Sequence, residues 1–176
     1  VRRNIDAWWP EIEAGASAII VNASGCGAQV KDYGHLLASD RDYAWRAERI
    51  SALAVDPVEF LEHWRDHLRP TDDAPRRIAF QSPCTLQHAQ GLTGRVESLL
   101  TGIGFDLAPV ADPHICCGSA GTYSVLQPQT AKQLRSQKLD NLNAGGPALI
   151  ATANIGCLTH LAEASDVPVR HWLELV

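Results

Sequence analysis

Four cysteines in the second half of the sequence each follow a segment whose composition predicts a β-strand: Cys84, Cys116, Cys117 and Cys157. In a parallel sheet, the loops beyond the carboxyl ends of the strands meet at one edge although they are distant in sequence. Thiolates that converge from several loops are the ligand set expected for an iron-sulfur cluster or for tetrahedral zinc. We therefore expect these four side chains to be metal ligands in one pocket.

Two alternative roles for these cysteines stay open. Free cysteine packs readily as a small hydrophobic residue, so each thiol could simply be buried in a core. Alternatively, Cys116 or Cys117 could be a catalytic thiol activated at a helix N-terminus. A disulfide between these two adjacent residues would be geometrically strained.

The residues that follow the cysteine pair are candidates for contacts with a bound group. Gly118, Ser119 and Gly121 allow the backbone to turn tightly and to aim amide N–H groups at sulfur or at another anion. An ordinary turn explains the same composition equally well. His88, His114 and His160 are close to cysteines in the sequence, and we expect local capping or packing roles for them rather than ligation.

Helical and strand patterns alternate along the chain. Apolar residues at helical spacing predict helices over 5–12, 96–103 and 128–142, and an Asp-Pro-Val-Glu sequence at 56–59 predicts a capped helix start. Apolar, β-branched runs predict strands over 18–22, 77–81, 105–110 and 148–153, and glycine-rich composition predicts a loop at 23–27. This alternation indicates an α/β fold with mainly parallel sheets flanked by helices.

Two parts of the chain have similar order and sequence. A helix, a strand and a Gly-Cys pair occur at Gly25-Cys26 and again at Gly156-Cys157. We interpret them as a duplicated module whose first copy is truncated. The expected divisions are a remnant of the first module at 1–40, a helical connection and linker at 41–75, and a complete second module at 76–176.

Composition excludes several classes of protein. The 176 residues have a net charge of -5 and no basic run, which argues against a nucleic-acid partner. The apolar runs are too short to span a bilayer. The five cysteines, the absence of methionine and a start without a signal-peptide pattern lead us to expect a fragment of a protein from a reducing compartment.

The cysteine spacing resembles that of a known family. Thirty-one residues lie between Cys84 and Cys116, and 39 lie between Cys117 and Cys157. Together with Cys-Cys-Gly at 116–118, this pattern is similar to the cysteine-rich CCG module of heterodisulfide reductase catalytic subunits and of the iron-sulfur subunits of glycolate- and lactate-oxidising complexes. The strings at 21–27, 32–37, 84–90, 116–123 and 154–160 most resemble the glycolate oxidase iron-sulfur subunits.

The resemblance implies an electron-transfer role without direct contact with glycolate. It implies an iron-sulfur cluster, of the 4Fe-4S type, with structural zinc as the alternative; a fragment handled in air can lose either metal. Cys26 would be the last cysteine of the first module and a metal ligand there. Where the family has Cys-x-x-Cys, this chain has Ala23 and Asn154, so each module lacks one thiolate. The implied partners are flavin-containing glycolate oxidase subunits and a ferredoxin-like N-terminal part of the same subunit. The implied location is cytoplasmic, peripheral to the inner membrane through partner subunits, with electrons passing toward a quinone-type acceptor.

Overall fold

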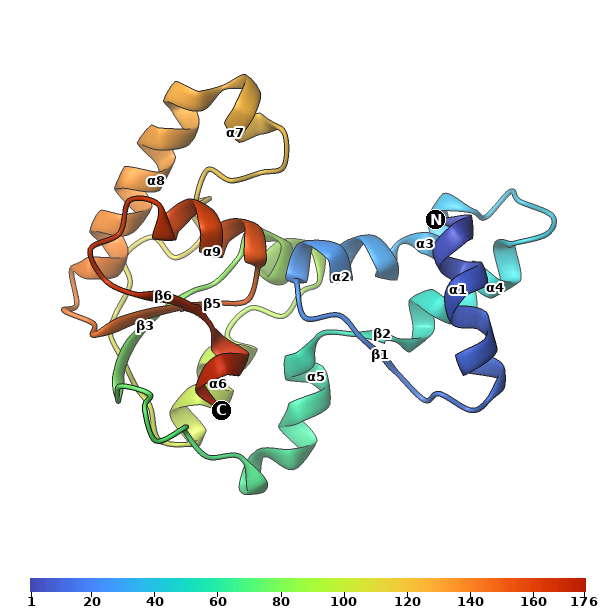
Figure 1. Cartoon of the computed structure of the whole chain (residues 1–176), viewed down its shortest axis with the longest axis horizontal. Coiled ribbons are helices and arrows are strands. Elements are labelled where there is room, and N and C mark those ends of the chain that lie inside the picture. The colour runs from blue at the N-terminus through green and yellow to red at the C-terminus, as the bar shows by residue number, and fades with distance from the viewer.

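The chain forms two parallel sheets with helices packed around them. The computed structural model describes residues 1–176 (Figure 1). The elements, in chain order, are α1 (Arg2–Glu13), β1 (Ile19–Ile20), α2 (Ser24–Lys31), α3 (Tyr33–Leu36), α4 (Ala44–Leu53), β2 (Ala54–Val55), α5 (Pro57–Leu61), η1 (Glu62–His67), β3 (Arg77–Gln81), η2 (Thr85–Ala89), α6 (Arg95–Gly102), β4 (Asp106–Leu107), α7 (Tyr123–Leu126), α8 (Pro128–Asn143), β5 (Leu149–Thr152), α9 (Ile155–Ala162), β6 (Val169–His171) and η3 (Trp172–Leu175). None of the helices combines the length and the apolar character needed to cross a bilayer.

The larger sheet has four parallel strands in the order β4-β3-β5-β6. β3 comes first in the chain, β4 pairs on one side of it, and β5 pairs on its other side. The chain therefore changes direction of winding between β3 and β5, which is where ligand crevices form in open α/β sheets. The predicted α/β class with parallel sheets flanked by helices is confirmed.

Alternate residues of the central strands face two different cores. Ile78 and Phe80 pack in one core with α6 and η3, whereas Ala79 packs in the other core with α8 and α9. The side chains of β5 alternate in the same way: Leu149 packs in the core with α6 and η3, and Ile150 packs in the core with α8 and α9. Because successive side chains of a strand point to opposite faces, a sheet covered on both faces needs apolar residues at every position. This requirement explains the unbroken apolar runs at β3 and β5.

The first part of the chain has a separate small core. β1 and β2 pair in parallel, and Ile5, Val30, Tyr33, Ala47 and Ile50 pack together beside them. In Figure 1 the helices α1, α3 and α4, which contribute to this core, lie at the opposite end of the molecule from α8. α2 extends from these helices toward the larger sheet and contacts η2.

Several predicted elements differ from those in the structure. The strand at 77–81 and the capped helix start at 56–59 are confirmed. The loop predicted at 23–27 is wrong, because α2 begins at Ser24 and includes Cys26. The Ser24 N–H donates to the Ala153 carbonyl oxygen, 3.0 Å away, so a contact from a distant part of the chain anchors this helix start. The strands predicted over 18–22 and 105–110 are only two residues long.

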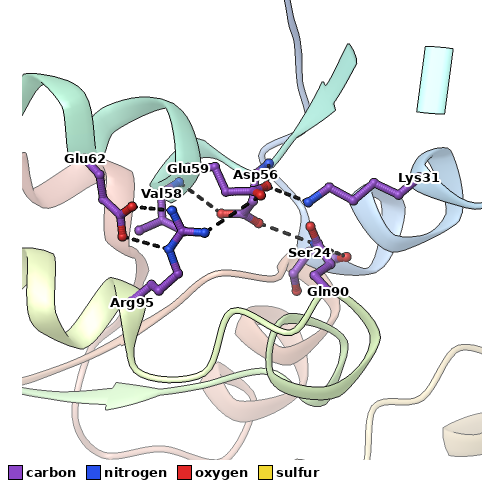
Figure 2. Close-up of polar contacts among 8 residues, drawn as sticks. All are labelled: Ser24, Lys31, Asp56, Val58, Glu59, Glu62, Gln90 and Arg95. Carbon is purple, nitrogen blue, oxygen red and sulfur yellow. Dashed lines mark hydrogen bonds and ion pairs between the residues drawn. The ribbon is translucent and has the colours of Figure 1, made fainter. Parts of the chain in front are cut away.

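A polar network joins the two parts of the chain (Figure 2). Asp56 is buried and caps α5, accepting a hydrogen bond from the Val58 N–H at 3.1 Å, while the Asp56 N–H donates to Glu59 at 2.8 Å. Glu59 also pairs with Lys31 of α2. The Gln90 amide donates to the Ser24 carbonyl oxygen at 2.9 Å. Burial raises the pKa of Asp56, so its hydrogen bonds to backbone and side chain are what offset the cost of placing a carboxylate there.

Replacing Asp56 by alanine tests the importance of this network. Asp56→Ala removes the cap of α5 and a buried acceptor, and we expect it to lower the free energy of unfolding by about 1–2 kcal/mol. Asp73→Ala is the control, because Asp73 is exposed and pairs only with Arg170 on the surface; its effect should be below about 0.5 kcal/mol. Urea unfolding measures both, and equal losses would contradict this role of Asp56.

Candidate metal centre

Four cysteines from three separate segments of the chain line one pocket of about 580 Å³. Cys84 follows β3 and immediately precedes η2, Cys116 and Cys117 lie between β4 and α7, and Cys157 is in the first turn of α9, just after β5. Because β3 and β5 are neighbours and β4 borders β3, the segments that leave these strands begin at the same edge of the sheet. The strand order therefore gathers thiols that are distant in sequence.

The four thiols differ in their exposure. Cys84 is exposed and Cys116 is half-buried, whereas Cys117 and Cys157 are only 3% and 4% exposed. Cys117 and Cys157 pack in the same core as Leu139 and Leu142 of α8. The pocket thus has a closed inner side against α8 and an outer side open to solvent at Cys84.

The thiols also influence one another's ionisation. Hydrogen bonding from Cys117 and Cys84 holds the pKa of Cys116 far below its ordinary value, and hydrogen bonding from Cys117 lowers the pKa of Cys157. Correspondingly, hydrogen bonding to Cys116 raises the pKa of Cys84 and of Cys117. The pocket therefore stabilises negative charge at Cys116 and Cys157 more than at Cys84 and Cys117.

Backbone and side-chain donors point at two of the sulfur atoms. The Gly118 N–H donates to the Cys116 Sγ at 3.3 Å, and the Asn154 Nδ2 donates to the Cys157 Sγ at 3.6 Å. Ser119 and Gly121 line the same pocket. Gly118, the third candidate from the sequence, lies in the same loop next to Cys117. Donors in these positions stabilise negative charge on sulfur.

Gly118 has to be glycine for two geometric reasons. Its φ is +89°, in the left-handed region that residues with a Cβ rarely adopt. A Cβ at this position would also lie 2.3 Å from the carbonyl oxygen of Ala131 in α8. The loop that carries Cys116 and Cys117 can therefore lie directly against α8 only because Gly118 has no side chain.

The first part of the chain supplies one wall of the pocket. Gly25 lines it, and the Gly25 N–H donates to the Asn154 Oδ1 at 3.2 Å. The Ser24 hydroxyl lies 2.8 Å from the Thr85 hydroxyl, next to Cys84. The start of α2 is thus fastened beside both Cys84 and Cys157.

Other candidates from the sequence lie elsewhere. Cys26 is exposed and lines a different pocket, of about 560 Å³, against Trp8 and Tyr33. His160 lines the cysteine pocket, and its Nε2 donates a hydrogen bond to the Ala131 carbonyl oxygen at 3.4 Å. His88 and His114 are not part of the pocket wall.

Four thiols are a donor set that is used both for iron-sulfur clusters and for tetrahedral zinc. No group of three or more His, Cys, Asp or Glu side chains is arranged to hold one metal ion. Tetrahedral zinc needs all four sulfur atoms at about 2.3 Å from one point. A cluster of several irons instead takes thiolates spread around it, and the four thiols here line one pocket of about 580 Å³.

Two residues beside the pocket were not assigned a role by sequence reasoning. Lys138 lies on the inward side of α8 and is fully buried, and Asn154 contacts both Gly25 and Cys157. The signal for Lys138 was its position, four residues after Leu134 and four before Leu142, on the apolar stripe of the helix. A lysine in such a stripe indicates a buried charge.

Comparison with known proteins identifies the domain that contains these cysteines. The family model of the cysteine-rich domain CCG matches residues 78–162. Over 176 residues the chain is 55% identical to the glycolate oxidase iron-sulfur subunit of Escherichia coli (strain K12), covering 99% of this chain and 43% of that protein, in its C-terminal part.

Two more distant relatives have related names. The chain is 30% identical to a probable glycolate oxidase iron-sulfur subunit of Bacillus subtilis (strain 168), covering 82% of this chain and 33% of the relative. It is 28% identical to lactate utilization protein A of Exiguobacterium sp. (strain ATCC BAA-1283 / AT1b), covering 93% of this chain and 69% of the relative. The chain thus spans less than half the length of the two glycolate oxidase subunits.

Replacing Gly118 by alanine tests the contact between the cysteine loop and α8. We expect Gly118→Ala to cost roughly 2–4 kcal/mol in the free energy of unfolding, because it combines left-handed backbone strain with a steric clash. Gly121→Ala is the control: its φ is +57° but a Cβ would meet open space, so only about 1 kcal/mol of strain is expected. Unfolding in urea measures the difference. Equal losses for the two variants would contradict the close approach to α8.

Proposed function

We propose that this chain, whose residues 78–162 match the family model of the cysteine-rich domain CCG, is an electron-transferring iron-sulfur subunit of a complex that oxidises glycolate. Its relatives are named as iron-sulfur subunits of glycolate oxidase and as a lactate utilization protein. The proposal places the oxidation of the 2-hydroxy acid at a flavin in a partner subunit, with electrons passing on toward a quinone-type acceptor. The ferredoxin-like N-terminal part of the same subunit is the second proposed partner.

The observation that carries the proposal is the gathering of four thiols in one pocket. Cys84, Cys116, Cys117 and Cys157 are the residues that would hold an iron-sulfur cluster, and when bound, the cluster would supply one-electron transfer. The Gly118 N–H and the Asn154 amide would stabilise the charge on the sulfur atoms that they contact.

The position of the pocket also supports transfer to and from a partner. Cys84 is exposed, and Val125 and Leu126 of α7, which follows the cysteine loop, are 77% and 72% exposed. One side of the site is therefore accessible, while Cys117 and Cys157 keep the opposite side in the protein core. Partial burial of this kind limits solvent access and helps to set the potential of a redox centre.

The identity and ligands of the metal can be tested on the chain itself. After anaerobic reconstitution with iron and sulfide, we expect bound iron, acid-labile sulfide and a broad visible absorption band that dithionite bleaches. Alanine substitution of Cys84, Cys116, Cys117 or Cys157 should each remove most of this absorption, because each removes one thiolate ligand. Cys26→Ala is the matched control and should leave it unchanged, since Cys26 lines another pocket.

Different outcomes of that experiment would exclude the proposal. A colourless protein with stoichiometric zinc would indicate a structural docking module without a redox role. A single fast-reacting thiol, with no metal bound under any condition, would instead favour thiol catalysis. Loss of absorption in Cys26→Ala equal to that in the other variants would exclude the pocket as the site.

The proposed substrate can be tested in the assembled complex. Under anaerobic conditions, glycolate should bleach the visible absorption of the iron-sulfur centre, because electrons reach it from the flavin subunit. L-Lactate is the comparison substrate, and faster bleaching with lactate than with glycolate would reassign the 2-hydroxy acid. Absence of bleaching with either acid, in a complex that dithionite still bleaches, would contradict a 2-hydroxy-acid donor.

A further inference from the structure

Lys138 is a fully buried lysine without a carboxylate partner. Its side chain is 0% exposed, on the face of α8 that packs against the larger sheet. The ammonium donates one hydrogen bond, to the Pro113 carbonyl oxygen at 2.8 Å, and none of the eight ion pairs in the chain includes it. Buried lysines are rare unless they are paired, so an anionic partner is expected nearby.

The surroundings of Lys138 identify that partner. Pro113, its acceptor, lies in the loop that leads to Cys116 and Cys117. The next residue of α8, Leu139, packs in one core with Cys117 and Cys157. Burial lowers the pKa of Lys138, whereas negative charge on Cys117, Cys157 and Cys116, and less so on Asp112, raises it. Asp112 is exposed and makes no ion pair with Lys138. The negative charge available to Lys138 is therefore that of the pocket thiolates.

We propose that the Lys138 ammonium is the fixed counter-charge of the thiolates of Cys116, Cys117 and Cys157, and that it raises the reduction potential of the centre they hold. This inference rests on the proposed function for its redox part. Reduction adds one electron, and hence one negative charge, to a site that is already anionic. A positive charge buried close behind the thiolates stabilises the reduced form more than the oxidised form, so it favours acceptance of the electron.

The chain offers matched variants for a test. Lys138→Met keeps a long unbranched side chain without charge, Lys138→Gln keeps a hydrogen-bond donor for Pro113 without charge, and Lys138→Arg keeps the charge. Lys132→Met, on the exposed side of α8, removes a charge of the same sign and is the control. If Lys138 only holds the Pro113 carbonyl, Lys138→Gln should behave like the parent chain and Lys138→Met should not. If the charge of Lys138 matters, these two variants should behave alike.

The first measurement is the midpoint potential of the anaerobically reconstituted chain, titrated with a chemical reductant. We expect both neutral variants to lower the equilibrium constant for reduction about tenfold or more, which is ~59 mV per tenfold for a one-electron couple. Lys138→Arg and Lys132→Met should remain close to the parent chain. Unchanged potentials in both neutral variants would overturn the inference.

The second measurement uses the metal-free chain and does not depend on the proposed function. Without the buried charge, the pocket thiolates are less stable, so alkylation by iodoacetamide at fixed pH should be about three- to tenfold slower in Lys138→Met and Lys138→Gln. Lys132→Met should react like the parent chain. If the parent chain binds no cluster, the proposed function fails. If alkylation rates are equal in all variants, the role of Lys138 fails, whether or not a cluster binds.

Discussion

The parallel pairing of β3 with β5, with β4 on the far side of β3, is the constraint on which the rest of the site depends. It sends the segments after all three strands to one edge of the sheet, and Cys84, Cys116, Cys117 and Cys157 lie in those segments. Both faces of the sheet are covered, by α6 and η3 on one side and by α8 and α9 on the other. The edge beyond the strand ends is therefore where backbone and polar groups can meet a ligand without disturbing a core.

The second determinant of the site is electrostatic. Four thiols in one pocket tend to ionise only in part, and the hydrogen bonds among them lower the pKa of Cys116 and Cys157 while raising that of Cys84 and Cys117. The Gly118 and Asn154 donors stabilise negative charge at sulfur, and the buried Lys138 donates to the Pro113 carbonyl oxygen in the loop that leads to Cys116. Asn154 also binds the Gly25 N–H, so the start of α2 helps to hold a donor to Cys157 in place.

Much of this arrangement could be predicted from the sequence, because the periodicity and the residue types that signal it are local. The strand at 77–81 and the cap at Asp56 are examples. The gathering of the four cysteines could be predicted because parallel topology implies it, whereas their role as ligands stays a prediction. The loop expected at 23–27 was wrong because its glycines indicate a turn, while the contact of Ser24 with Ala153, 129 residues away, anchors a helix. The position of Lys138 on an apolar stripe indicates burial, but its role could not be predicted because that depends on which distant groups pack against it.

The central claim is that these four thiols, from three separate segments of the chain, hold one iron-sulfur centre. The most direct test is a crystal structure of the anaerobically reconstituted chain with anomalous diffraction at the iron absorption edge. We expect iron bonded to the Sγ atoms of Cys84, Cys116, Cys117 and Cys157, beside the Gly118 N–H. Anomalous signal confined to Cys26, or a single zinc ion in place of iron among the four thiolates, would contradict it.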